Sequence, residues 1–509
     1  MPNTTIGPAS GYPSGRLLLT NSVLNFAGQA APLALGIVAI PILLRTLGLE
    51  RFGLLAIVWA FLGYFSIFDL GLGRALTKLV ADRSHLDDPT ELRALIWSAL
   101  LLMVAVGIAG GIAIWTLSPL LLNEVIRPPT ALRAESQVTL FWLSIGVPVV
   151  TCSSGLRGVL EAKQRFGWVG AVRLVLGIST FVGPLLVLPF SKSLAAIVPV
   201  LVASRLLATV VSFAQCQRII PGFAHPMVRP TLFPTLLRYG SWMTVSNVIG
   251  PLMTYLDRFF IAAVLSLSAV AYYVTPYELT ARLTVVPASV AGVLFPAFAS
   301  ANQGMRTRVP WLFTRGTLFM GVIWFGVCMC LLAVTRPAMI LWLGPAFSSH
   351  AIVVLQVLVL ATFVNGMAYI PFALIQATGR ADVTAKLHLA ELPMYLAGLV
   401  VMVHFAGIVG AATMALARAS ADFLLLLYFS GRVTALSLQS LRGIGLGVVI
   451  GCIALGLTLM PVPEPLLVLY ALTVITAVVV VSWKRLLVPA ERAVVVGFAT
   501  RLSLGRLLG

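Results

Sequence analysis

Apolar residues dominate the chain in long runs, and short polar or basic segments separate them. Each run matches the roughly 20 residues that a helix needs to cross the hydrocarbon of a bilayer. We therefore predict an all-α polytopic membrane protein with about 14 transmembrane helices. The predicted spans are 17–44, 51–73, 94–117, 137–160, 167–189, 193–214, 235–262, 270–299, 311–334, 350–376, 384–405, 407–429, 443–461 and 465–483.

The spans divide into two halves at a polar, proline-rich segment. Asn25 and Gly28 open one span, and Asn247 and Gly250 open another at the same spacing. This pattern indicates either a parallel internal repeat or a chance likeness of two apolar hairpins. The predicted parts are a cytoplasmic tail (1–16), a six-helix lobe (17–214), a cytoplasmic linker (215–234), a second, pseudo-symmetric six-helix lobe (235–430), two additional helices (431–483) and a cytoplasmic basic tail (484–509).

Charge and composition support a membrane protein and give it an orientation. The chain is 60% apolar and 10% charged, whereas soluble domains are about 25% charged. Its net charge is +18, and the basic residues lie mostly between the apolar runs. With the N-terminus inside, 22 of the 34 Lys and Arg residues lie in inside segments and six in outside segments. This asymmetry is typical of cytoplasmic loops, predicts that both termini are cytoplasmic, and argues against nucleic-acid binding.

Known catalytic motifs are absent from the sequence, which contains no HExxH, no P-loop and no GxSxG. Gly71-x-Gly73 lacks the third glycine of a dinucleotide site and predicts a tight bend or a packing contact. Cys328 and Cys330 point to different faces of a helix, so they predict neither a metal site nor a disulfide. We expect a transporter without a cofactor, driven by a gradient, by downhill substrate flux or by a partner.

Ionisable residues inside the predicted spans are the candidate functional residues. Each costs about 2.5–3.5 kcal/mol in hydrocarbon, so such residues normally face a bundle interior or a wet cavity. The pairs Glu278/Arg282 and Arg418/Asp422 have helical i,i+4 spacing, so each pair either neutralises itself or serves the transport pathway. The residues predicted to serve conformational change or ion coupling are Asp69, Asp257, Glu278, Glu391, Arg418 and Asp422.

Two further features concern histidine and arginine. His388 and Glu391 share a helical face and form either a proton relay or a structural hydrogen bond. Arginine also lies within the spans without a matching set of acids, which predicts that an anionic substrate supplies the missing charge. Its planar guanidinium bonds phosphate oxygens in pairs. The predicted anion-binding residues are Arg157, Arg173, Arg205, Arg258 and Arg282.

Three short stretches carry a family resemblance. They are Leu47-Gly48-x-Glu50-x-Phe52-Gly53, Phe68-Asp69-Leu70-Gly71-Leu72-Gly73-x-x-Leu76-x-Lys78 and Asp257-Arg258-Phe259-Phe260-Ile261-x-x-x-Leu265. The chain resembles the bacterial polysaccharide transporter family, the flippases of O-antigen and exopolysaccharide precursors within the multidrug/oligosaccharidyl-lipid/polysaccharide exporter superfamily. The two C-terminal spans are similar to those of the related lipid II flippases.

The resemblance implies a fold and a function. The fold would be two six-helix lobes around a central cationic cavity. The function would be translocation of an undecaprenyl-diphosphate-linked oligosaccharide across the bacterial inner membrane by alternating access, for lipopolysaccharide or exopolysaccharide biosynthesis. The implied partners are the lipid bilayer, that lipid-linked glycan, and the polysaccharide polymerase and chain-length proteins.

Two other functions remain open from the sequence. A cation-coupled drug antiporter of the same superfamily would need an acidic cavity, whereas the first half of this chain is basic. A membrane glycan polymerase or ligase would need a large outside loop with catalytic side chains. The longest predicted outside loop, about 118–136, is short.

The predicted topology can be tested with reporter fusions. A reporter at Pro128 is expected to read outside, and reporters at His225 and Arg308 are expected to read inside, because the basic loops stay in the cytoplasm. Enzymatic reporters that are active on only one side of the membrane measure this. An inverted reading at His225 or Arg308 would break the span assignment.

Overall fold

The computed structural model describes residues 34–83, 89–304, 308–434, 436–486 and 492. This part of the chain is helical and contains no strand, which confirms the predicted all-α class. Within it, ten helices are long and apolar enough to cross a membrane, and Ala34–Leu47 forms a shorter apolar helix. Residues 17–33 of the predicted span 17–44 lie outside the described residues, as do the predicted tail 1–16 and most of the predicted basic tail 484–509.

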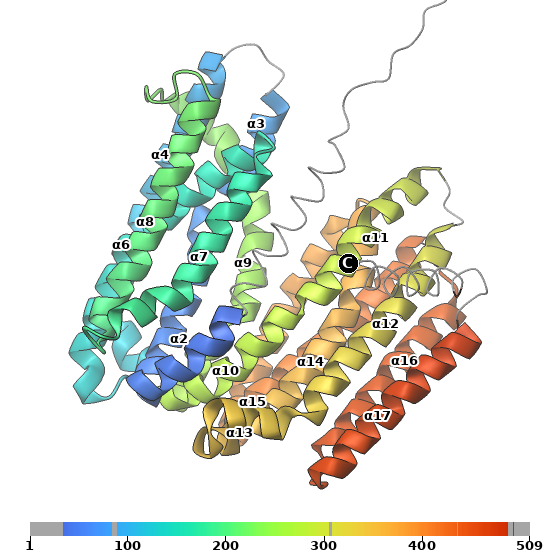
Figure 1. The fold of residues 1–509 in the computed structure, drawn as a ribbon. Coiled ribbons are helices and arrows are strands. Elements are labelled where there is room, and N and C mark those ends of the chain that lie inside the picture. Colours follow the sequence, from blue (N-terminus) through green and yellow to red (C-terminus); the bar gives the residue numbers. More distant parts are fainter. Residues whose placement is uncertain (1–33, 84–88, 305–307, 435, 487–491, 493–509) are drawn as a thin grey trace, which may run out of the picture. The chain divides into compact units, whose positions relative to one another are not determined.

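Figure 1 shows the order of the helices along the chain. The longer ones are α2 (Leu49–Tyr64), α3 (Leu72–Arg83), α4 (Pro89–Thr116), α6 (Arg133–Ala162), α7 (Phe166–Val187), α8 (Leu194–Ile219), α9 (Phe233–Val264), α10 (Leu267–Leu283), α11 (Val285–Gly304), α12 (Val309–Ala333), α13 (Thr335–Leu343), α14 (Pro345–Ala377), α15 (Ala381–Thr434), α16 (Leu438–Gly456) and α17 (Glu464–Val481).

Most predicted spans coincide with a helix, and three places differ. The predicted span 270–299 covers two helices, α10 and α11, with Thr284 between them. The predicted span 51–73 is interrupted, because α2 ends at Tyr64 and a 3₁₀ turn leads to Leu70 and Gly71, whose φ angles are 47° and 68°. The bend predicted at Gly71 is therefore confirmed. The predicted spans 384–405 and 407–429 form the single element α15, which has a non-helical residue, Gly407, between its two arms.

Close contacts divide the chain into two compact units. Unit 1 comprises Met1–Thr275 and Leu399–Ile408, and unit 2 comprises Pro276–Gly398 and Val409–Gly509. The division falls inside α10 rather than at the predicted linker 215–234, because α9 packs on α2 and α3 of unit 1. The two pseudo-symmetric lobes and the central cavity between them stay predictions.

Unit 1 is built around the packing of α4, α6 and α8 (Figure 1). Small residues let α4 approach α6 closely. A Cβ atom on Gly107 would lie 2.6 Å from the Cα of Pro148, and one on Gly111 would lie 2.5 Å from the carbonyl oxygen of Ser144. Such contacts are typical of membrane helices, where packing rather than the hydrophobic effect holds helices together.

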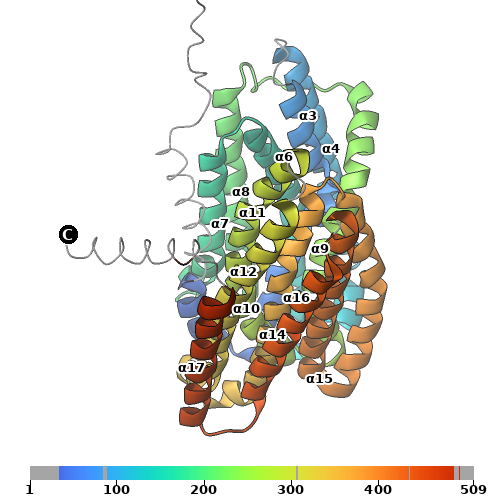
Figure 2. The same ribbon diagram turned by 90° about the vertical axis from the view of Figure 1, so that its right-hand side faces the viewer.

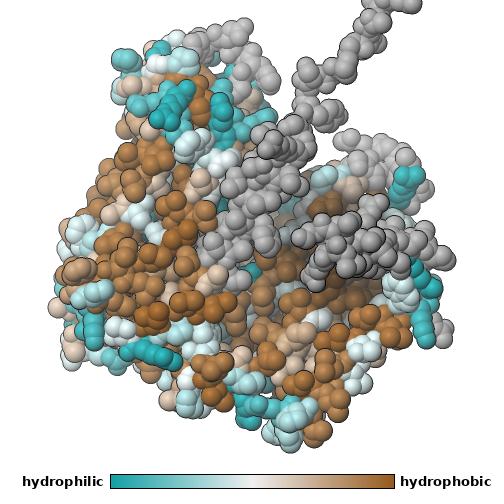
Figure 3. All heavy atoms as spheres, in the orientation of Figure 1, coloured by the Kyte–Doolittle hydropathy of each residue, from teal (hydrophilic) through white to brown (hydrophobic). Residues whose placement is uncertain are grey.

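The outer surface of unit 1 is apolar. Leu186 on α7 and Val210 on α8 are 64% and 56% exposed. Hydrophobic residues cover the face of this unit seen in Figure 3, with hydrophilic residues near the ends of the helices. An apolar surface of this extent would be a liability in water, and it suits contact with lipid.

Unit 2 has α14 at its centre, and α11, α12, α13 and α16 pack against it. The buried indole N–H of Trp324 on α12 donates to the carbonyl oxygen of Phe363 on α14 at 3.2 Å. The last two helices, α16 and α17, form a hairpin (Figure 2), in which the Tyr470 hydroxyl donates to the carbonyl oxygen of Ala454 at 2.9 Å.

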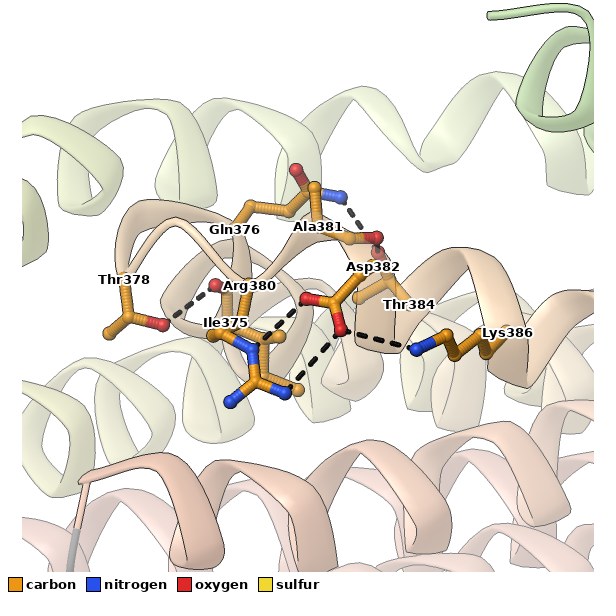
Figure 4. A network of polar contacts seen from close by, with 8 residues as sticks. All are labelled: Ile375, Gln376, Thr378, Arg380, Ala381, Asp382, Thr384 and Lys386. Atoms are coloured by element: carbon orange, nitrogen blue, oxygen red, sulfur yellow. Dashed lines mark hydrogen bonds and ion pairs between the residues drawn. The ribbon is translucent and has the colours of Figure 1, made fainter. Parts of the chain in front are cut away.

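The short turn between α14 and α15 is fixed by side chains (Figure 4). Arg380 and Lys386 both contact the carboxylate of Asp382, at 3.0 and 3.5 Å. The amide of Gln376 donates to the Thr384 hydroxyl at 2.8 Å and ties the end of one helix to the start of the next. The turn therefore holds the two helices side by side at this end.

A glycine-to-alanine pair tests the close packing of unit 1. A Cβ atom on Gly53 of α2 would overlap the carbonyl oxygen of Leu267, whereas one on Gly170 of α7 would meet nothing within 4 Å. Gly53→Ala is expected to lower stability by about 1–3 kcal/mol, because backbone must move. Gly170→Ala should keep or raise stability, since alanine favours helix. Thermal unfolding in detergent measures both, and equal behaviour of the variants would contradict the packing.

Candidate functional site

The predicted coupling residue Asp69 accepts hydrogen bonds from two neighbours in unit 1. Its Oδ1 accepts the backbone N–H of Gly71 at 2.8 Å, and its Oδ2 accepts the Ser154 hydroxyl at 2.8 Å. Arg157 in turn donates to the Ser154 oxygen at 3.5 Å. Asp69 thus stabilises the bend after α2 and places a carboxylate near the first of the predicted anion-binding arginines.

Three of the predicted arginines lie on the adjoining helices α6, α7 and α8. Hydrogen bonds between the helices set their relative depth: Ser179 of α7 lies beside Ser204 of α8, and Thr209 of α8 lies beside Val149 of α6. At a rise of 1.5 Å per residue, Arg157, Arg173 and Arg205 then follow one another at steps of about 10 and 7.5 Å along the helix axes. They form a series of positive charges through unit 1.

The partners of these arginines differ. Arg157 lies 4.0 Å from Glu161 on its own helix, and its side chain is half exposed. Arg205 donates to the backbone oxygen of Leu201 at 2.8 Å. Within the described residues, no carboxylate forms an ion pair with Arg173 or Arg205. The guanidinium groups of these two arginines can therefore still bind an anion that the protein itself does not supply.

Arg258 lies in a different setting, in the interior of unit 1. Its side chain is 1% exposed and its guanidinium lies over the Tyr255 ring, 5.0 Å from the ring centroid. The neighbouring Asp257 is 2% exposed, accepts the backbone N–H of Arg258 at 2.8 Å, and accepts the Tyr273 hydroxyl at 2.6 Å. The Tyr273 contact fixes α10 to α9, so Asp257 has a clear packing role.

The predicted pair in α10 forms. The Arg282 guanidinium donates to the Glu278 carboxylate at 3.0 Å, and the two side chains are 23% and 17% exposed. An arginine with its own counter-charge needs no anion from outside. Arg282 therefore differs from Arg173 and Arg205 in its need for a substrate charge.

A cluster of ionisable side chains lies between the two arms of α15 in unit 2. Nε2 of His388 lies 3.6 Å from Oδ1 of Asp422, and donor atoms of His388, Glu391 and Asp422 all lie within 4.8 Å of one another. Arg418 lies over the ring of Tyr395, 5.6 Å from its centroid. The structure thus brings the predicted His388/Glu391 face together with Arg418 and Asp422, and among the described residues Arg418 and Asp422 form no ion pair with each other.

Unit 2 also contains a large apolar cavity. It has a volume of about 880 Å³ and lies among α12, α14, α16 and α17. Its walls are mainly aliphatic and aromatic, with a few polar groups. The lining residues include Trp311, Arg315, Phe325, Phe363, Ile444 and Val474. A cavity of this size and character suits a long hydrocarbon chain better than a sugar.

Sequence reasoning missed several members of these sites. Ser154 and Tyr273 gave no signal of their own, although acids inside predicted spans, such as Asp69 and Asp257, indicated that polar surroundings had to exist. The apolar cavity had no sequence signal either, because its lining is indistinguishable in composition from a lipid-facing surface.

Comparison with known proteins identifies the family of the chain. Residues 18–302 match the family described as polysaccharide biosynthesis protein. A protein of Shigella flexneri that is named as an O-antigen transporter is 30% identical over 419 residues, which cover 82% of this chain and 98% of that protein. The chain belongs to the polysaccharide transporter family. The family predicted from the sequence is therefore confirmed, and with it a transporter rather than an enzyme.

Solved structures support the fold of this transporter. The lipid II flippase MurJ in an inward closed conformation gives a TM-score of 0.71 at 14% identity, with 92% of this chain and 99% of that chain covered. An inward-facing multidrug resistance MATE transporter of the MOP superfamily gives 0.67 at 13% identity, with 82% and 98% covered. A flippase and a drug transporter thus share this fold, so the fold alone does not choose between substrates.

The role of Tyr273 can be measured with a matched pair of Tyr→Phe variants. Tyr273 donates to a buried carboxylate, whereas the exposed Tyr428 hydroxyl accepts a hydrogen bond of the same 2.6 Å length from Arg432. Tyr273→Phe is expected to cost about 1–3 kcal/mol of stability, because a buried charged acceptor loses a donor. Tyr428→Phe should cost less than about 0.5 kcal/mol. Thermal unfolding of both purified variants measures these losses of stability. Equal losses in the two variants would contradict a special role for Tyr273.

Proposed function

We propose that this transporter moves an undecaprenyl-diphosphate-linked oligosaccharide from the inner to the outer leaflet of the bacterial inner membrane by alternating access. The glycan then serves lipopolysaccharide or exopolysaccharide biosynthesis. Both termini lie in the cytoplasm in this proposal, and the polysaccharide polymerase and chain-length proteins act after the transporter. The proposal takes its substrate class from the O-antigen transporter to which the chain is similar.

The observation that carries the proposal is the series of arginines in unit 1. Arg173 and Arg205 lie on membrane-spanning helices, and no ion pair with a carboxylate is found for them among the described residues. An uncompensated guanidinium in a membrane is costly, so a bound anion would relieve that cost. A diphosphate offers several oxygens in the geometry that a guanidinium bonds in pairs.

The chemistry of the remaining parts of such a substrate fits the same proposal. The diphosphate is common to carrier lipids that bear different glycans, so its recognition would not depend on the sugars. In this proposal the polyprenyl chain stays in the lipid. Arg205 and Arg173 are the residues that we assign to the diphosphate, with Arg157 at the predicted cytoplasmic side.

A cation-coupled drug antiporter is the second candidate, because a multidrug transporter shares the fold. Its substrates are commonly cationic, and basic side chains such as Arg173 and Arg205 would repel them. The two functions therefore predict opposite effects when these positive charges are removed: export of a lipid-linked anion is lost, whereas transport of a cation is kept or improved.

Substitution of the two arginines tests the proposal. Arg173→Gln and Arg205→Gln are expected to lower surface polysaccharide about tenfold or more, because each removes charge-assisted hydrogen bonds worth about 1.5–3 kcal/mol. Lipid-linked precursor should then remain on the cytoplasmic leaflet. Lysine at the same positions should restore export only partly, since it keeps the charge and loses the paired geometry.

The control for this experiment lies on the same helix. Arg218 is exposed in the last turn of α8, so Arg218→Gln should export as the wild type does. Membrane abundance of every variant is measured in parallel. Wild-type export from Arg173→Gln and Arg205→Gln at normal abundance would remove the main support for an anionic substrate.

A further inference from the structure

The ionisable cluster of α15 has no place in the proposed recognition of the diphosphate. It lies in unit 2, whereas the arginines of α7 and α8 lie in unit 1. His388 and Glu391 come from the first arm of α15, and Asp422 and Arg418 come from the second arm, beyond Gly407. A mixed set of one imidazole, two carboxylates and one guanidinium is unusual on membrane-spanning helices, where every charge needs a partner.

Glu391 is the group whose surroundings point to a ligand. It is 7% exposed, and neither of its carboxylate oxygens has a hydrogen-bond partner among the described residues. Asp422 is 6% exposed, and its Oδ1 likewise has no hydrogen bond, although His388 lies 3.6 Å away. A buried carboxylate without a donor is strongly disfavoured in its ionised form. Something positive therefore belongs in this cluster.

Counting charges shows how much positive charge is missing. Ionised Glu391 and Asp422 contribute two negative charges, Arg418 contributes one positive charge, and neutral His388 contributes none. One added monovalent positive charge makes the cluster neutral. Among the described residues, the charged or titratable groups that face Glu391 are His388, Asp422 and Arg418, and α14 adds the uncharged ring of Phe372 beside His388.

We propose that this cluster is a proton-binding site in which Glu391 holds the proton and His388 is the route by which it enters and leaves. His388 is the accessible member, since its side chain is 31% exposed while that of Asp422 is 8% exposed. On release, the Glu391 carboxyl proton passes to the free nitrogen of His388, and the imidazolium then gives it to water. Glu391 ends ionised and His388 neutral, so the cluster changes from zero to one negative charge.

A proton fits the donor set better than a metal ion does. Hard cations such as Ca²⁺ and Mg²⁺ prefer oxygen ligands throughout, and one of the three ligands here is an imidazole nitrogen. The cluster also contains the positively charged side chain of Arg418, which would repel a bound divalent cation. The proton needs only the acids and the accessible imidazole that the structure provides.

The claim that this site couples protons to transport rests on the proposed function. The claim that the site binds a proton does not depend on that function. In the transporter, the change in charge between the two arms of α15 would bias their packing and so couple proton movement to glycan movement. The decisive measurement is therefore made on the purified full chain in liposomes, without any glycan.

Infrared difference spectra recorded between about pH 5 and 9 test the site. A carbonyl-stretch band of a neutral carboxylic acid is expected to titrate in the wild type and to disappear in Glu391→Gln. Glu124, which is exposed and paired with Arg127, supplies the matched acid control. Glu124→Gln should keep the band. Absence of a titrating band that responds to Glu391→Gln overturns the proposal.

His388→Gln provides a second variant that keeps the acid. It should leave the band in place and slow its exchange after a pH jump, because the accessible route is gone. His404 is exposed on the same element, so His404→Gln should exchange as the wild type does. Unchanged exchange in His388→Gln would remove the assigned role of that residue.

Two further measurements distinguish a metal site from a proton site and test coupling to export. They are the infrared band in the presence of sodium chloride and surface polysaccharide export in cells. If sodium ions abolish the band at constant pH, the site holds a metal ion and the proton proposal is wrong. Surface polysaccharide export by Glu391→Gln should be lost at normal membrane abundance. A titrating band in a protein that fails to export lipid-linked glycan would overturn the proposed function and leave the proton site standing.

Discussion

The cost of placing charge in hydrocarbon is the constraint on which this structure depends. It explains why the described residues are helical, since a helix satisfies its own backbone in lipid. It also explains the arrangement of the ionisable side chains. Asp257 is paired with the Tyr273 hydroxyl and Glu278 with Arg282, and each of these contacts lies between helices or along one helix. Charged side chains that have such hydrogen-bond or ion-pair partners stabilise the fold.

The same constraint identifies the side chains that are left for function. Arg173 and Arg205 in unit 1 and Glu391 in unit 2 do not have their charge balanced by a hydrogen-bonded ion pair in the described structure. Arg173 and Arg205 would bind an anion, and Glu391 would bind a positive charge. Substrate recognition and energy coupling would thus use opposite charges, on residues of different units.

Close helix packing supplies the rigidity that such sites need. Gly107 and Gly111 let α4 lie directly against α6, and Gly53 lets α2 approach Leu267. The bend at Gly71 and the break at Gly407 are the places where the helices change direction. Asp69 fixes the first of these through the Gly71 N–H, so one of the predicted coupling residues has a structural role.

The sequence by itself determined the class, the family and the place of most helices, because a run of about 20 apolar residues is a local property. It also located the break between residues 405 and 407 and the pair Glu278/Arg282, since i,i+4 neighbours are fixed by helix geometry. Only the tertiary structure decided which partners come from elsewhere. Ser154 meets Asp69 across 85 positions, and Tyr273 reaches Asp257 from the next helix. The union of His388 and Glu391 with Asp422, and the cavity beside α16 and α17, likewise depend on how helices pack, which no local pattern of residues specifies.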